Sequence, residues 1–130
     1  MASEQTTKKI LVVDDQENWR KALTSLLEDH ESSVASAQDF ETATALLAQG
    51  AFDLVVLDVR LVDQDKFNAE GLDLLHHIRA TSPATKTVIL TGYPESVHEK
   101  PDVDAYIFKV PSGSHFDSRA FKRRIKELLQ

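Results

Sequence analysis

Short apolar runs recur along the chain, and each ends abruptly in a polar side chain. Four of them cover Ile10–Val13, Leu54–Leu57, Val88–Leu90 and Tyr106–Phe108. The run at 54–57 is continuous Leu-Val-Val-Leu, and such a lack of alternation is typical of strands buried on both faces of a parallel sheet. A weaker run at Ser33–Ala37 predicts a fifth strand.

Between these runs, apolar residues recur at three- and four-residue spacing, which is the pattern of one helix face. Trp19 belongs to the first such stripe and is expected to face the core. Asp39 is a typical N-cap residue, and Gly50 is a typical helix end. The predicted helices extend from after Asp15 to about Asp29, from Asp39 to Gly50, over 71–80, and from an Asp117 or Ser118 cap to Leu129.

The stretch between Thr91 and Tyr106 has a weaker pattern. It holds Pro94 and Pro101, which leave room for little more than two helical turns. We therefore expect a short or irregular fourth helix there. With it, strand and helix alternate five times, which predicts an α/β fold: a doubly wound, five-stranded parallel sheet with helices on both faces.

The 130 residues fit one domain, which we expect to span 8–130 after a disordered N-terminus at 1–7. The chain has no cysteine, which excludes disulfides, thiol catalysis and thiolate metal sites. No apolar run approaches the length of a membrane helix, and the N-terminus does not resemble a signal segment. These features favour a cytoplasmic protein without membrane contact.

The net charge of −6 argues against direct nucleic-acid binding. The charge is unevenly spread, because Ser118–Gln130 holds five basic residues and one acidic residue, which gives +4 there and −10 elsewhere. This segment is either a solvated helix face or a contact face for an acidic partner or a second copy.

Reactive polar side chains follow the predicted strands: Asp14-Asp15, Asp58, Thr91 and Lys109. If the strands are parallel neighbours, these five side chains emerge at the carboxyl edge of the sheet, where open α/β folds place ligands. Each alone has a simpler explanation; the acid pair, for example, could merely cap a helix. Together, three acids, a hydroxyl and an amine predict a site for a divalent metal and then a phosphoryl group.

Four motifs carry a family resemblance: Lys-Ile-Leu-Val-Val-Asp-Asp at 9–15, Asp-Leu-Val-Val-Leu-Asp at 53–58, Val-Ile-Leu-Thr-Gly at 88–92 and Tyr-Ile-Phe-Lys at 106–109. The chain resembles the receiver domains of response regulators in two-component phosphorelays, from about Lys8 to Leu129. This resemblance implies the flavodoxin-like (βα)5 form of the predicted fold.

The resemblance also implies a role for each residue of the cluster. Asp58 would be the phosphoacceptor, and Lys109 would bind the phosphoryl group. Thr91 would be the switch hydroxyl and Tyr106 the switch aromatic. The implied Mg²⁺ ligands are Asp14, Asp15, Asp58 and the main-chain carbonyl of Arg60.

By the same resemblance, a histidine kinase or phosphotransfer protein would transfer a phosphoryl group to Asp58, which would switch a protein-interaction surface. The protein would be a signalling switch rather than an enzyme, catalysing only its own phosphorylation and autodephosphorylation. It would act on a downstream protein or an attached output domain, and the resemblance leaves a homodimer open.

Three alternatives compete with this interpretation. A degenerate receiver would bind partners without phosphorylation, but its site residues would be eroded. A phosphatase of the haloacid dehalogenase type needs a second acid two residues after the nucleophile, where this chain has Arg60. A flavin-binding flavodoxin needs amides and hydroxyls after the first strand, where this chain has acids.

The chain departs from the family pattern at three places. Val59–Glu70 is longer than the usual turn and lacks its proline, so it is either a lid, a partner-reading loop or an idle insertion. The stretch from Thr91 to Lys109 is about one helical turn shorter than usual. Pro111 lies one position later than the proline that commonly follows the lysine.

Overall fold

The computed structural model describes residues 7–57, 70–91, 103–108 and 117–130. In this part of the chain, all five predicted strands and the four predicted helices with clear periodicity are confirmed. The predicted fourth helix and the expected disordered terminus lie almost wholly outside the described residues. The elements are β1 Lys8–Val13, α1 Glu17–Leu27, β2 Ser32–Ala37, α2 Phe40–Gln49, β3 Leu54–Leu57, α3 Glu70–Thr81, β4 Lys86–Thr91, β5 Ala105–Phe108 and α4 Ser118–Leu129.

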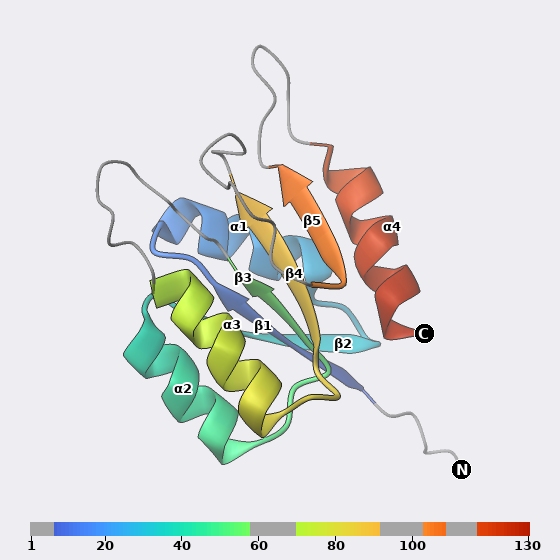
Figure 1. Ribbon diagram of the computed structural model, residues 1–130. Helices are drawn as coiled ribbons and strands as arrows, with labels where there is room; N and C mark the ends of the chain where they lie inside the picture. Colours follow the sequence, from blue (N-terminus) through green and yellow to red (C-terminus); the bar gives the residue numbers. More distant parts are fainter. Residues whose placement is uncertain (1–6, 58–69, 92–102, 109–116) are drawn as a thin grey trace.

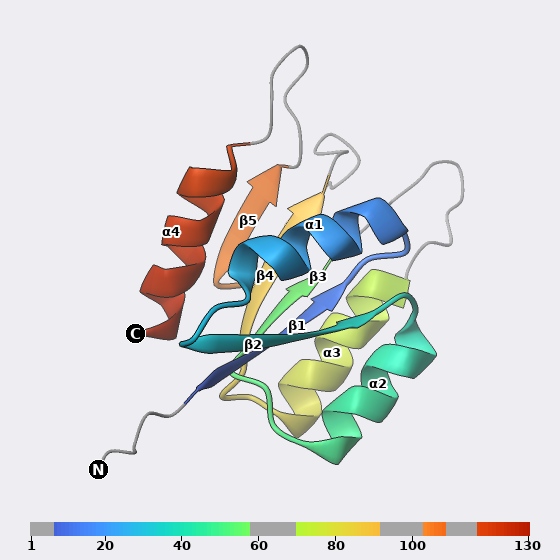
Figure 2. The same cartoon turned by 180° about the vertical axis from the view of Figure 1, so that it is seen from behind.

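The strands form one parallel sheet in the order β2-β1-β3-β4-β5. Helices α2 and α3 cover one face of it, and α1 and α4 cover the other (Figures 1 and 2). This is the flavodoxin-like, doubly wound arrangement, in which the strand order reverses between β1 and β3. In the described residues, no helix is long and apolar enough to cross a membrane.

Two hydrophobic cores explain the uninterrupted apolar runs. Leu54 and Val56 of β3 belong to the core under α1 and α4, whereas Val55 and Leu57 belong to the core under α2 and α3. All four side chains are at most 1% exposed. Because both faces of the strand are covered, neither set of alternating positions can be polar.

Two aspartates pin the amino-terminal edge of the sheet in the same way. The Lys9 amide donates to Asp53 Oδ2 at 2.8 Å, and the Asp53 amide donates to the Lys9 carbonyl at 2.8 Å. The Thr87 amide likewise donates to Asp104 Oδ2 at 2.8 Å, and the Asp104 amide donates to the Thr87 carbonyl at 2.9 Å. Each aspartate therefore fixes the register of the strand that it precedes against a neighbouring strand.

Helices α2 and α4 begin at the predicted caps. Asp39 Oδ1 accepts a hydrogen bond from the Thr42 amide at 2.8 Å, and Asp117 Oδ1 accepts one from the Ala120 amide at 3.0 Å. Each bond satisfies an amide that has no partner within its own helix. The predicted boundary of α2 at Gly50 is also confirmed.

Candidate functional site

The carboxyl ends of β1 and β3 lie side by side. Val13, the last residue of β1, pairs in register with Leu57, the last residue of β3. Asp14 follows the first strand directly, and Asp58 follows the second in the sequence. Asp58 and Arg60 themselves lie outside the described residues, so the structure describes two of the four predicted metal ligands.

The next pair of strands ends at the same edge of the sheet (Figure 1). Thr91 is the last residue of β4 and pairs in register with Phe108, the last residue of β5. Lys109 is the next residue in the sequence and lies outside the described part of the chain. Tyr106 lies in β5 and pairs with Ile89.

Asp14 is a buried carboxylate held in a defined turn. It is 2% exposed, whereas the neighbouring Asp15 is exposed to solvent. Asp14 Oδ1 accepts the Gln16 amide at 2.9 Å, and its own amide donates to the Ala37 carbonyl of β2 at 3.1 Å. Helix α1 begins after Gln16, which is its N-cap residue. Neither acid is therefore the cap of this helix, which removes the simplest alternative for the pair.

The first turn of α1 supplies a contact that the sequence analysis missed. Arg20 Nη1 donates to the main-chain carbonyl of Asp14 at 2.8 Å. A basic residue one turn into the helix that follows an acid pair is a weak signal, because surface arginines are common on helices. Trp19, as predicted, packs against the core under α1 and α4.

The acid pair fits the requirements of Mg²⁺. Mg²⁺ prefers carboxylate and other hard oxygen ligands, and it usually keeps several of its waters. Asp14 is buried and Asp15 is exposed, so a cation held by this pair would have a fixed carboxylate on one side and solvent on the other. Among the residues described, no group of three or more His, Cys, Asp or Glu side chains gathers around one point, so the pair can supply only part of a ligand shell.

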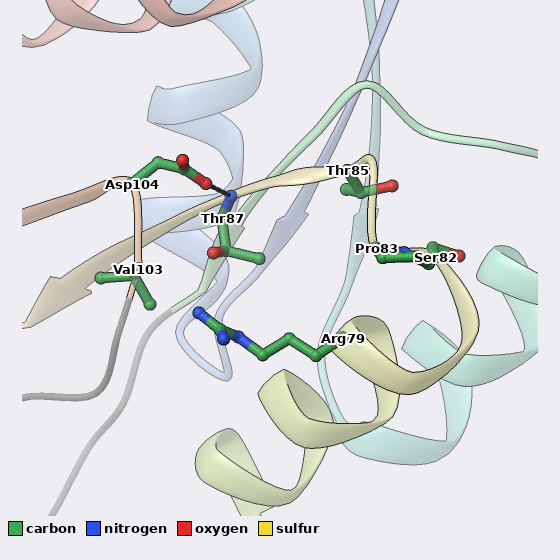
Figure 3. A pocket seen from close by; sticks show the side chains of 7 residues that line it. All are labelled: Arg79, Ser82, Pro83, Thr85, Thr87, Val103 and Asp104. Atoms are coloured by element: carbon green, nitrogen blue, oxygen red, sulfur yellow. Dashed lines mark hydrogen bonds between the residues drawn. The ribbon is translucent and has the colours of Figure 1, made fainter.

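A groove of about 300 Å³ lies near the amino ends of β4 and β5, at the edge of the sheet opposite the acid pair (Figure 3). Figure 3 shows the Arg79 side chain reaching from α3 toward Thr87 and Asp104. Asp104 here holds the Thr87 amide, so it serves the register of the strands. Because it lies at the opposite edge of the sheet, the groove is separate from the predicted site. Its lining residues are Arg79, Ser82, Pro83, Thr85, Thr87, Val103 and Asp104.

Two lysines of the basic helix α4 form ion pairs with acidic residues that follow α1. Lys126 Nζ lies 2.9 Å from Asp29 Oδ2 and 3.4 Å from Glu31 Oε1, and Lys122 Nζ lies 3.9 Å from Asp29 Oδ2. The hydrogen bond from Lys126 and the one from the Glu31 amide lower the pKa of Asp29 from 3.8 to about 2. The pKa of Lys126 is raised, chiefly by the same bond with Asp29.

A protein-family match and the similar proteins found by sequence comparison agree on one family. Residues 10–110 match the response regulator receiver domain. Over 85 residues, the chain is 38% identical to the alginate biosynthesis transcriptional regulatory protein AlgB of Pseudomonas aeruginosa. Over 84 residues, it is 36% identical to the transcriptional regulatory protein ZraR of Escherichia coli. Each alignment covers 65% of this chain but only 18% of the relative, so the chain corresponds to a small part of these regulators.

Solved structures give the same picture of the fold. The response regulator TrrA of Thermotoga maritima, in complex with Mg²⁺ and BeF, superposes with a TM-score of 0.75 at 29% identity, over 95% of this chain and 100% of that one. NtrX of Brucella abortus, in complex with ADP, superposes with a TM-score of 0.78 at 25% identity, over 95% of this chain and 27% of that one.

Proposed function

The chain belongs to the response regulator receiver domain family, and on this premise we propose that residues 8–130 form a Mg²⁺-dependent phosphoacceptor switch with Asp58 as the acceptor. The observation that carries the proposal is the position of the acid pair: Asp14 and Asp15 lie at the end of β1, beside the end of the strand that leads to Asp58. The presence of all the expected residue types favours this function over a degenerate receiver.

In the proposed reaction, a carboxylate oxygen of Asp58 attacks the phosphorus of a phosphohistidine. The new P–O bond forms as the P–N bond breaks, the histidine nitrogen takes the electron pair of that bond, and the leaving imidazole gains a proton from solvent. Bound Mg²⁺ would neutralise the negative charge that the carboxylates and the phosphoryl oxygens bring together. Asp14 and Asp15 would hold the cation, with Asp58 and the carbonyl of Arg60, and Lys109 would contact the phosphoryl oxygens.

The output is proposed to follow from the added charge. An aspartyl phosphate brings a charge near −2 and new acceptor oxygens. We expect the Thr91 hydroxyl to donate to one of these oxygens and Tyr106 to change its position in response. A histidine kinase or phosphotransfer protein would be the donor, and a downstream protein or an attached output domain would receive the signal.

The test is phosphorylation by a small donor. The native chain, incubated with acetyl phosphate and MgCl2, should gain the mass of one phosphoryl group in intact-mass spectra, and EDTA should prevent the gain. Asp58→Asn should abolish it, while Asp14→Asn and Asp15→Asn should raise the MgCl2 concentration required. As a matched control, removal of the exposed Asp73 charge on α3 by Asp73→Asn should change neither property.

Two results would contradict the proposal. If the native chain gains no mass, the domain is not a phosphoacceptor, and binding of a partner without phosphorylation becomes the better hypothesis. If Asp58→Asn gains the same mass as the native chain, the acceptor is a different residue.

A further inference from the structure

The turn that carries the acid pair is fixed from several directions. The amide of Asp14 is held by the Ala37 carbonyl of β2, and its carboxylate is held by the Gln16 amide. The carbonyl of Asp14 accepts the Arg20 guanidinium at 2.8 Å. Two of these bonds are local or come from the sheet, whereas the third comes from a side chain of α1. Arg20 thus ties the start of the helix to the end of β1.

Arg20 reaches Asp14 from the first turn of α1. Its own amide donates to the Gln16 carbonyl at 3.1 Å, so the residue belongs to the first turn of α1. Its side chain turns back by six residues to Asp14 and is partly buried. A guanidinium keeps its charge at all physiological pH values and has several donors on a planar group. Its capacity to donate to the carbonyl therefore does not change with pH in that range.

The Arg20 guanidinium binds the main-chain oxygen of the residue that carries the buried carboxylate. Neighbouring carboxylates repel each other, most strongly where one of them is buried. Before a metal binds, this repulsion acts on the turn, and a bond that holds the turn opposes it. Because the Arg20 bond ends on the main-chain oxygen, it can persist while the carboxylates bind a cation.

We propose that Arg20 is a positioning residue for the Mg²⁺ site: it fixes the Asp14–Gln16 turn and so holds the acid pair ready for the metal. This inference rests on the proposed function, because it assumes that the pair binds Mg²⁺. It assigns no contact between Arg20 and the metal or the phosphoryl group.

The experiment is an MgCl2 titration of the full chain, followed by amide NMR shifts and by Trp19 fluorescence. Arg20→Met keeps most of the apolar stem but has no donor, and Arg20→Ala serves as a second truncation. Both should weaken Mg²⁺ binding by about fivefold to tenfold, the range for loss of one hydrogen bond. Arg20→Lys keeps a charged donor of similar length and should recover most of the affinity.

Lys21→Ala is the matched control. Lys21 is the next cation on the same helix, but it pairs with Glu17 at 3.2 Å. Its removal takes away the same charge without touching the turn, so the affinity should stay within about twofold of the native value. Hydrogen exchange of the Gln16 amide gives a local measurement: it should become several times faster in Arg20→Met, relative to the core amide of Val12, and remain native in Lys21→Ala.

The outcomes separate the two proposals. If Arg20→Met or Arg20→Ala binds Mg²⁺ as tightly as the native chain, or more tightly, Arg20 does not position the acid pair. If Lys21→Ala weakens binding as much as the truncations do, the loss of affinity comes from removing any positive charge on α1, and the inference is again wrong. If the native chain itself shows no response to MgCl2, the proposed function fails, and the role of Arg20 fails with it.

Discussion

Substituting Asp29 with asparagine tests the contact that ties the C-terminal helix α4 to the turn after α1. Asp29 Oδ2 lies 2.9 Å from Lys126 Nζ, and 97 residues separate the two in the sequence. The side chains are about a quarter exposed, at 25% and 27%. Asparagine keeps an acceptor for the Glu31 amide, which donates to Asp29 Oδ1 at 2.8 Å, so the substitution removes mainly the charge.

The pKa of Asp29 sets the magnitude. This pKa is lowered from 3.8 to about 2, and the hydrogen bond from Lys126 is the largest cause. Each unit by which the pKa differs between the folded and the unfolded chain corresponds to about 1.4 kcal/mol, so this shift bounds the contribution at about 2.5 kcal/mol. Because the pair is partly exposed and therefore screened by solvent, we expect about 1 kcal/mol.

The pH dependence follows from the direction of the shift. The folded chain holds the Asp29 proton less tightly than the unfolded chain, so the stabilisation is complete above about pH 4 to 5 and is lost as pH falls toward 2. The difference in the free energy of unfolding between the native chain and Asp29→Asn should therefore be greatest near neutral pH. It should shrink in acid, where the native carboxyl also becomes neutral.

Urea unfolding at several pH values, followed by Trp19 fluorescence, measures this difference. Lys126→Met provides the control: in that background Asp29→Asn should cost much less, because its main partner is already gone. A cost that stays constant from pH 7 to pH 3, or that is the same with and without Lys126, would refute the reasoning. High salt should reduce the cost in the native background.

Other substitutions test the frame that positions the site. Asp104→Ala removes the acceptor of the Thr87 amide, and because Thr87 is only 3% exposed, the free energy of unfolding should fall by about 1 to 2 kcal/mol. Asp104→Asn keeps an acceptor and should lose less; equal losses in urea unfolding would contradict this role. Ile125 of α4 is 0% exposed, so Ile125→Ala should cost about 3 kcal/mol and Ile125→Val about 1 kcal/mol, and calorimetric melting compares the two. Asp117→Ala should cost about 1 kcal/mol and speed hydrogen exchange at the Ala120 amide, while Asp117→Asn should remain close to native; unchanged exchange in Asp117→Ala would show that the cap does not hold the helix.

The periodic elements were predictable because burial alone determines them. The buried run Leu54–Leu57 and the stripe that includes Ile125 reflect how many faces of each element are covered. Helix ends were less certain. The first helix ends at Leu27, two residues before the predicted end at about Asp29, because Asp29 and Ser32 exchange backbone hydrogen bonds in a turn that leads into β2.

The polar contacts were not predictable from the pattern. Nothing in the spacing of Arg20, Asp53 or Asp104 indicates that each side chain bonds to a main-chain group of another element or turn. Such contacts depend on distances between elements, which exist only once the helices and strands have packed. In retrospect, an aspartate directly before a strand, as in Asp53-Leu54 and Asp104-Ala105, is the pattern to look for. The acid pair itself was predictable, because it is contiguous and follows a strand.

The amino edge of the sheet fixes the register of the strands, and the site proposed at the carboxyl edge depends on that register. In a parallel sheet, the point where a strand ends is set by its register, and a slip of one residue would turn its side chains to the opposite face. Asp53 holds β3 against β1, and Asp104 holds β5 against β4, both at the amino edge. Those bonds determine which residues stand at the carboxyl edge, beside Asp14. The chemistry proposed for one edge therefore depends on carboxylates at the other edge that never touch the metal or the phosphoryl group.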